Sequence, residues 1–309
     1  YVKCVYQNPN TRWYSGAGIY RNVWLIRRKP LHFMLDGLYI STQKQEGERW
    51  QVLIDSEVEW RKHQGEVTIH HILKDQEGKV LGESSKVVAL SGEGYDQQKI
   101  QVTSPKLWDI GQGNLYELTS MLSFENEIVD TVTQKIGFKT MALDTNKGFF
   151  LNGERVEIKG VCQHHDLGAL GAAVNREAIR RQFEILQEMG VNAIRTAHNM
   201  PAVEVMELAD EMGLLIYSES FDMWEDSKTE FDYGVYFKEW WQKDVKSWVR
   251  RDRNHVSLML WGIGNEIFDT RFAKGEPIAK ALCEAVRKWD PRRNGFTAIG
   301  SNFIEFEET

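Results

Sequence analysis

The chain has 309 residues, a length that predicts two or three domains. Apolar residues make up 42% of it and charged residues 27%, a balance typical of globular proteins with a sizeable core. The 38 basic and 45 acidic side chains give a net charge of −7, which argues against nucleic acid as a partner because phosphate binding needs a basic face. No apolar stretch approaches the length of a membrane span, so we expect no membrane partner.

The three cysteines, Cys4, Cys162 and Cys283, lie far apart and include no Cys-x-x-Cys pair. Their spacing indicates neither a zinc site nor a disulfide framework. The chain opens on Tyr1, without a Met or a charged and apolar leader. We therefore expect that the start is cut, and a missing signal peptide says nothing about export.

Residues 20–140 show short segments that alternate between apolar and polar side chains and are separated by turn residues. Residues 67–73 (VTIHHIL) and 115–122 (LYELTSML) follow this period of two, and residues 75–78 (DQEG) form a predicted turn. Strands spaced by 8–12 residues with no helical stretch between them predict a β-sandwich.

The pattern changes at about residue 141. Asn152-Gly153, between two apolar segments, is a strong hairpin signal. After it, apolar strand-like segments alternate with amphipathic helices. The predicted strands are residues 156–161, 193–195, 214–217, 257–263 and 296–299. The predicted helices are residues 176–189, 202–212, 237–251 and 273–289.

The first predicted helix places Ile179, Phe183, Leu186 and Met189 on one face. The continuous apolar run at residues 258–261 predicts a strand of a parallel sheet that is buried on both faces. This alternation of strands and helices favours a doubly wound sheet or a barrel. No Gly-x-Gly-x-x-Gly follows the first strand, which disfavours a dinucleotide-binding sheet.

Polar side chains follow four of the predicted strands. The segments are residues 163–166 (QHHD), 195–199 (RTAHN), 218–224 (SESFDMW) and 265–266 (NE). Each segment has a structural interpretation: a His after a strand could be a satisfied loop residue, and Arg195 could be an ion-pair partner. Glu219 and Asp222 could cap a helix, and Glu266 could lie in a first helical turn. In a parallel barrel, however, the four strand ends meet on the face where barrel active sites are built. Their convergence therefore favours a functional site.

The residue types at these strand ends favour carboxylate chemistry. His164 and His165 are adjacent on an extended segment and point to opposite sides, which disfavours a metal site built on both. The sequence contains no His-Glu-x-x-His and no Gly-x-Ser-x-Gly. Glycoside cleavage needs one carboxyl as acid and another as nucleophile or base, among groups that hydrogen-bond to the sugar. We therefore expect a glycoside hydrolase without a cofactor.

Two segments resemble the signatures of glycoside hydrolase family 2. Residues 192–201 (NAIRTAHNMP) are similar to its first signature, and residues 251–266 (RDRNHVSLMLWGIGNE) to its longer acid/base signature. Residues 12–21 (RWYSGAGIYR) are similar to the end of its N-terminal sugar-binding-like domain. The resemblance covers essentially the whole chain. It implies a jelly-roll remnant at residues 1–30, an immunoglobulin-like β-sandwich at 31–140, and about strands 1–5 of a catalytic (β/α)₈ TIM barrel at 141–309.

The resemblance also implies roles for individual residues. Glu266 would be the general acid/base of a retaining mechanism, and Asn265 would contact the hydroxyl next to the anomeric carbon. The predicted substrate-binding residues are Asn265, His198, Arg195, His164, Asp166, Asp222 and Trp224. Residues 220–224 (SFDMW) resemble a bacterial subgroup mostly described as β-galactosidases.

The sequence departs from the family pattern in two places. Where the magnesium-dependent β-galactosidases of the family carry a Glu and a His as metal ligands, this chain has Met223 and Glu225, so we predict no metal. The family's nucleophile is a Glu near the end of strand seven, and the strand count places Glu305, Glu307 and Glu308 too early for that role. We expect a chain that is truncated at both ends and inactive by itself.

The expected function is that of a retaining β-glycosidase, with β-galactosides as the first choice of substrate. The alternatives are a β-glucuronidase, a β-mannosidase or a non-catalytic carbohydrate-binding relative. A carbohydrate is the expected partner, and a homo-oligomer is left open. The compartment is left open as well, with a bacterial periplasmic or secreted location preferred to the cytoplasm.

Overall fold

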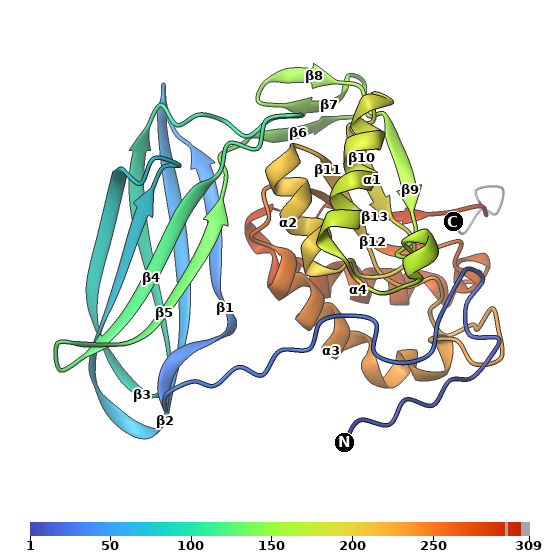
Figure 1. Ribbon diagram of the computed structural model, residues 1–309, viewed down its shortest axis with the longest axis horizontal. Helices are drawn as coiled ribbons and strands as arrows, with labels where there is room; N and C mark the ends of the chain where they lie inside the picture. Colours follow the sequence, from blue (N-terminus) through green and yellow to red (C-terminus); the bar gives the residue numbers. More distant parts are fainter. Residues whose placement is uncertain (294–295, 304–309) are drawn as a thin grey trace. The chain divides into compact units, whose positions relative to one another are not determined.

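The computed structural model describes residues 1–293 and 296–303, without the side chains of residues 62, 63 and 293. The chain divides into two compact units, which we describe separately (Figure 1). The barrel unit comprises Tyr1–Val23, Ile158–Asp252 and the described residues from Ser257 onward, and the sandwich unit comprises Trp24–Glu157 and Arg253–Val256. Residues 1–30 form no helix or strand, so the jelly-roll remnant stays a prediction.

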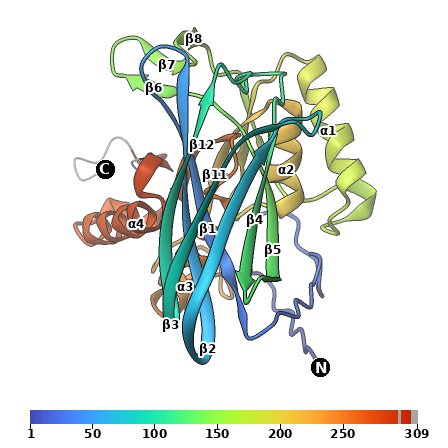
Figure 2. The ribbon, with the colours of Figure 1, turned by 90° about the vertical axis from the view of Figure 1, so that its left-hand side faces the viewer.

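The sandwich unit is built on five antiparallel strands. They are β1 (Leu31–Lys44), β2 (Arg49–Lys74), β3 (Val80–Thr103), β4 (Tyr116–Phe124) and β5 (Glu127–Ile136). The first half of β2 pairs with β1 and its last part pairs with β4, while β3 pairs with both halves. Figure 2 shows β2 and β3 as long paired strands.

The length of β2 and β3 differs from the expected series of short strands. Residues 67–73, predicted as one strand, are only the last part of β2. Between Glu59 and Gln64 the pairing of β2 with β3 shifts register, and such a bulge bends a strand and increases its twist. One strand can therefore contribute to both halves of the sandwich, a property that local alternation does not reveal.

The core of the sandwich unit follows the predicted period of two. Along the end of β3, buried and exposed residues alternate, with Ile100 and Val102 facing inward. Aromatic side chains fill much of the interior: the ring of Phe138 meets Trp50 edge-on at 5.6 Å and Tyr116 at 5.0 Å between ring centroids. The hydrophobic face that each strand buries holds the sheet pairing in register.

A three-stranded antiparallel sheet ends the sandwich unit, with strands β6 (Met141–Asp144), β7 (Gly148–Leu151) and β8 (Glu154–Val156). Asn152 and Gly153 join β7 to β8 with φ angles of 53° and 88°. Two successive left-handed residues form the turn that Asn-Gly favours, which confirms the predicted hairpin. The predicted strand at residues 156–161 is wrong, because β8 ends at Val156 and the next strand begins at Gly160.

The barrel unit contains five parallel strands in chain order. They are β9 (Gly160–Gln163), β10 (Ala193–Thr196), β11 (Leu215–Glu219), β12 (Leu258–Asn265) and β13 (Thr297–Gly300). Between them run α1 (Arg176–Glu188), α2 (Val203–Met212), α3 (Gly234–Asp252) and α4 (Gly275–Trp289), and the short 3₁₀ helices η1 (Gly168–Leu170), η2 (Phe268–Arg271) and η3 (Pro291–Arg293). A strand order without a reversal is that of a TIM barrel rather than a doubly wound sheet, which decides between the two predicted architectures.

Local signals fix the ends of the barrel helices. The side-chain oxygen of Asn175 accepts a hydrogen bond from the backbone N–H of Ala178 at 3.0 Å and so caps α1. Of the predicted apolar face of α1, Ile179 and Phe183 are buried, whereas Met189 is 71% exposed. The prediction fails at Met189 because α1 ends one residue before it.

Candidate active site

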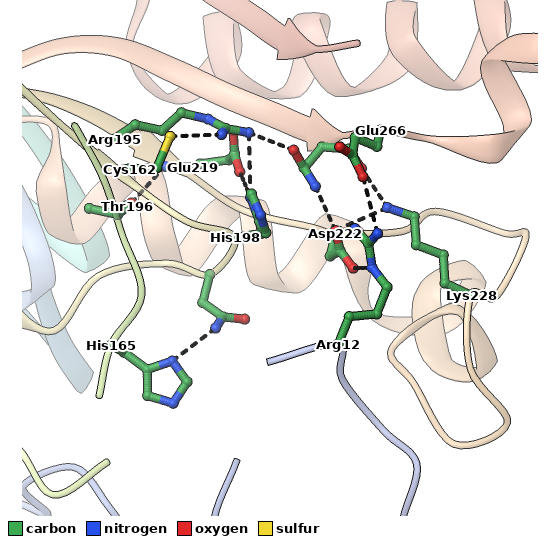
Figure 3. A network of polar contacts seen from close by, with 12 residues as sticks. Arg12, Cys162, His165, Arg195, Thr196, His198, Glu219, Asp222, Lys228 and Glu266 are labelled. Carbon is green, nitrogen blue, oxygen red and sulfur yellow. Dashed lines mark hydrogen bonds and ion pairs between the residues drawn. The ribbon is translucent and has the colours of Figure 1, made fainter. Parts of the chain in front are cut away.

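The carboxyl ends of β10, β11 and β12 bring together polar side chains that are far apart in the sequence (Figure 3). Arg195 lies on β10, Glu219 ends β11, and Asn265 ends β12, with Glu266 directly after it. Parallel pairing places these ends at one edge of the sheet, as the sequence predicts.

Arg195, on β10, contacts side chains of the three strands β9, β11 and β12. Its Nε donates to Oε2 of Glu219 at 2.7 Å, one Nη2 hydrogen bond reaches Oδ1 of Asn265 at 2.7 Å, and Nη1 lies 3.3 Å from Sγ of Cys162. The other oxygen of Glu219 is 2.7 Å from Nδ1 of His198. Burial, the largest single cause, lowers the pKa of Arg195, but the charge of Glu219 and the hydrogen bonds to Cys162 and Glu219 together outweigh burial and raise the pKa. The ion pair compensates the fully buried Glu219 carboxylate.

Two glycines provide the space for this arrangement. A Cβ on Gly262 would lie 2.7 Å from Cγ of Glu219 and 2.5 Å from a ring carbon of Tyr217. A Cβ on Gly300 would lie 2.7 Å from Nη2 of Arg195. Real Cβ atoms do not approach neighbours this closely, so glycine is needed at both positions for the side chains to meet.

Asp222, three residues after β11, is the centre of a second group of contacts. Its carboxylate accepts hydrogen bonds from Arg12 (3.1 and 2.8 Å), from Nδ2 of Asn265 (2.7 Å) and from Nζ of Lys228 (3.0 Å). The side chains of Asp222 and Lys228 are each 1% exposed. Burial raises the pKa of Asp222, but the hydrogen bonds from Arg12, Asn265 and Lys228 together outweigh it and hold the pKa below its usual value. Asp222 is therefore ionised at neutral pH.

The backbone of Glu266 is fixed by a hydrogen bond, whereas its side chain is partly exposed. Its N–H donates to the carbonyl oxygen of Gly300 at 2.5 Å, and its φ of 46° lies in the left-handed region that few glutamates adopt. Such backbone conformations cluster at functional sites. The side chain is 38% exposed, and its Oε2 accepts a hydrogen bond from Nη1 of Arg12 at 3.1 Å. A substrate could reach this carboxyl group.

Three rings lie beside this polar group. The ring centroid of His164 is 5.1 Å from that of Trp13 and 5.2 Å from that of His198. Burial lowers the pKa of His164, His198 adds to the effect, and the charge of Asp166 opposes it. His164 is therefore neutral at neutral pH, and its buried Nδ1 has no hydrogen-bond partner among the described residues. Asp166 is half-buried, and its contribution to the site is the effect of its charge on the pKa of His164.

A cavity of about 310 Å³ adjoins these residues. Its walls include Trp13, His198, Phe221 and Asp222. Ser220 also lines it, and within the part of the chain that the structure describes its buried hydroxyl has no hydrogen-bond partner. Aromatic rings combined with a few hydrogen-bonding groups suit a small polar ligand such as a sugar.

One predicted site residue is placed elsewhere. Trp224 is fully buried in the core of the barrel unit, and its Nε1 donates to the carbonyl oxygen of Ile263 at 2.8 Å. The predicted contact with substrate is therefore wrong for Trp224, because no face of its ring can reach a sugar. Its position in a polar segment after β11 gave the misleading signal.

Three residues of the site were missed by the sequence reasoning. Arg12 and Trp13 come from the segment before the first strand, and Lys228 follows β11. Arg12 and Trp13 begin the segment that resembles the family's N-terminal domain, which was the available signal. Lys228 has no local signal, since a lysine in a loop is usually solvated.

Within residues 1–293 and 296–303, no group of three His, Cys, Asp or Glu side chains is placed to hold a metal ion. Met223 is buried, and Glu225 pairs with Lys238 at 3.0 Å. In the same residues, no helix is both long and apolar enough to cross a membrane. Glu305, Glu307 and Glu308 lie outside the described residues.

The fold and the site together define a TIM-barrel protein with a polar site at its strand ends. The family model "Glycosyl hydrolases family 2, TIM barrel domain" matches residues 143–296, and the model "Glycosyl hydrolases family 2" matches residues 34–139. The chain belongs to glycosyl hydrolase family 2, which confirms the resemblance seen in the sequence.

Similar bacterial proteins support this family assignment. "Beta-galactosidase BoGH2A" of Bacteroides ovatus is 43% identical over 269 residues, which cover 85% of this chain and 31% of that protein. A "putative beta-glucuronidase" of Formosa agariphila is 38% identical, over 84% of this chain and 24% of that one. The chain thus spans about a third or less of the length of these relatives.

Solved structures show the same architecture. A glycosyl hydrolase family 2 member from Bacteroides cellulosilyticus matches with a TM-score of 0.91 and 32% identity, over 94% of this chain and 38% of that one. A "beta-glycosidase from Bacteroides vulgatus" matches with a TM-score of 0.87 and 33% identity, over 94% and 36%. The comparisons support a glycoside hydrolase and leave open which sugar it releases.

Proposed function

We propose that this chain is part of a retaining β-glycosidase that hydrolyses terminal β-glycosides, with β-galactosides as substrates and Glu266 as the general acid/base. One observation carries the proposal: a partly exposed carboxyl group at the end of β12 lies directly beside an amide, Asn265, that is fixed on both sides. In a retaining mechanism this carboxyl gives its proton to the leaving oxygen and later takes one from the attacking water.

The contacts of Asn265 support its role beside the acid. Its Oδ1 accepts from Arg195 and its Nδ2 donates to Asp222, so the orientation of the amide is determined. An Asn amide has two N–H groups, and the second one can donate to a sugar hydroxyl. Asn265 would thus orient the ring while Glu266 acts on the glycosidic oxygen.

Among the described residues of the site, the cations are already paired with carboxylates, which favours a neutral sugar. Arg195 pairs with Glu219, Lys228 pairs with Asp222, and Arg12 pairs with Asp222 and Glu266. A uronic acid would need a cation that is not already neutralised by the protein. The 43% identity to a β-galactosidase also favours a neutral sugar. The alternatives are a β-glucuronidase, a β-mannosidase and a non-catalytic carbohydrate-binding protein.

We infer the domain division 1–30, 31–140 and 141–309, in which β9 to β13 correspond to barrel strands 1–5. The second carboxylate of the reaction would then follow strand seven. A chain with one of the two carboxylates should not turn over substrate. Incubation of the 309-residue chain with a nitrophenyl β-galactoside should therefore release no nitrophenol, and measurable release would refute this inference.

The acid/base role is tested in a longer chain that contains these residues and hydrolyses β-galactosides. Glu266→Gln should lower kcat/KM by roughly 10²- to 10⁴-fold for a poor leaving group, which depends on proton donation. The loss should be much smaller for dinitrophenyl β-galactoside, which leaves without a proton. Glu225→Gln, which removes a carboxylate paired with Lys238, is the matched control and should keep the rate.

Normal hydrolysis of the poor leaving group by Glu266→Gln would remove the assignment. The sugar is tested by a release screen against β-galactosides, β-glucuronides and β-mannosides. Preferred hydrolysis of a β-glucuronide would contradict the argument from paired charges.

A further inference from the structure

Arg12 contacts two carboxylates that lie far from it in the sequence. It precedes Asp222 by 210 residues and Glu266 by 254. Its Nε and Nη2 donate to the two oxygens of Asp222, and its Nη1 donates to Oε2 of Glu266. Figure 3 shows the single guanidinium group between the two carboxylates. The planar fork of an arginine suits such a double contact, whereas a lysine offers only a point charge.

The two ends of this bridge differ in burial. Asp222 is 1% exposed and also accepts from Asn265 and Lys228, so its carboxylate is fixed in position. Glu266 is 38% exposed, and ion pairs between exposed groups are weak and easily exchanged. Arg12 is therefore held in place by Asp222, and its Nη1 is free to donate to Glu266.

Lys228 completes the anchor from the other side. Its Nζ donates to Asp222 and to the carbonyl oxygen of Asn265 at 2.8 Å, next to Glu266 in the chain. The backbone before Glu266 and the side chain of Glu266 are thus both connected to the same buried carboxylate, through Lys228 and Arg12. This arrangement connects the Glu266 carboxyl group to a fixed group of the site.

We propose that Arg12 is a positioning residue for the acid/base carboxylate Glu266, with buried Asp222 as its anchor. The inference rests on the function proposed above. Glu266 gives its proton to the leaving oxygen and becomes a carboxylate, which Arg12 holds in place until an incoming water returns a proton. The segment that carries Arg12 and Trp13 is then a wall of the active site rather than a connection between domains.

The test compares variants in a longer chain that contains these residues and hydrolyses β-galactosides. Arg12→Ala should lower kcat for a poor leaving group by about 10- to 100-fold, the cost of a misplaced catalytic group, with little change in KM. For dinitrophenyl β-galactoside the loss should be smaller. Added guanidinium ion should restore part of the lost rate.

Arg176→Ala is the matched control. Arg176 also bridges two carboxylates, Glu207 and Glu211 on α2, and its side chain is 32% exposed compared with 40% for Arg12. It should keep the wild-type rate and show no response to guanidinium. Arg12→Lys keeps the charge without the fork and should lose less than Arg12→Ala, with the same dependence on the leaving group. It also serves as the test if the alanine variant does not fold.

A double-mutant cycle separates this inference from the proposed function. If Arg12 acts through Glu266, Arg12→Ala should cost almost nothing further in a Glu266→Gln background. Losses that multiply, or an Arg12→Ala variant with normal kcat on a poor leaving group, would overturn the inference and leave Glu266 assigned. A normal rate for Glu266→Gln by itself would overturn the proposed function instead.

Discussion

The sandwich unit and the barrel unit bury their polar groups in different ways. In the sandwich unit the buried ring of His71 lies between two hydroxyls, 2.8 Å from Oγ of Ser120 and 3.4 Å from Oγ of Ser56. Asp96 is a charged exception and pairs with Lys86. In the barrel unit, two of the buried carboxylates, Glu219 and Asp222, lie at the strand ends and are paired by cations.

The difference reflects what each kind of group costs. A neutral buried group needs only hydrogen bonds, whereas a buried charge needs both a counter-charge and hydrogen bonds. Natural sequences keep such groups where they serve a purpose, and strongly paired charges at strand ends mark a site. The barrel unit therefore places two charges of this costly kind, Glu219 and Asp222, where the chemistry is proposed.

The largest effect should come from removing the central charge of the barrel unit. Asp222→Asn leaves Lys228 and Arg12 without their shared counter-charge, and should lower the free energy of unfolding by about 3–5 kcal/mol. Asp130→Asn in the sandwich unit breaks the pair with Arg28, whose side chains are 23% and 19% exposed, and should cost about 1 kcal/mol. If urea unfolding showed the same loss of unfolding free energy for both variants, the two units would not differ in the cost of removing a charge.

The neutral histidine of the sandwich unit should respond to acid. Burial, the largest cause, lowers the pKa of His71 to about 4, with His70 adding to the effect and Asp96 opposing it. The unfolded chain, with a histidine pKa of about 6.5, then binds more protons between these values, so stability is lost as the pH falls from about 6.5 to about 4. The total loss should be about 3 kcal/mol.

Urea unfolding at a series of pH values measures this loss. His71→Gln should flatten the dependence between pH 6.5 and 4, since it removes the titrating group. His70→Gln, which changes the neighbouring ring that pairs with Glu83, is the control and should leave the slope nearly unchanged. A wild-type stability that is independent of pH over this range would show that His71 is not held neutral.

The smallest effect concerns the tryptophan whose predicted role proved wrong. Trp224→Phe leaves the carbonyl group of Ile263 without its donor, which should cost about 1–3 kcal/mol. Trp248→Phe, which removes the donor to Ser218, should cost a similar amount. Binding of galactose to the 309-residue chain should not change in Trp224→Phe. Weaker galactose binding at unchanged stability would show that the indole contacts sugar after all.

Much of the barrel unit was predictable because its signals are local. The helices begin and end within three residues of the predicted bounds, and the strand-end segments contain Arg195, His198, Asn265 and Glu266. In the sandwich unit, alternation gave the right architecture but the wrong strand lengths. A bulge that carries one strand through both halves depends on its partner strand and not on its own composition.

The alternation of strands and helices, the Asn152-Gly153 turn and the polar character of the strand ends can be predicted from the sequence alone. These follow from the period of the side chains and from backbone preferences, which act over a few residues. Only the tertiary structure placed Arg12 between Asp222 and Glu266 and Trp224 in the core. Such placements depend on the packing of segments that are far apart in the sequence, and no local pattern contains that information.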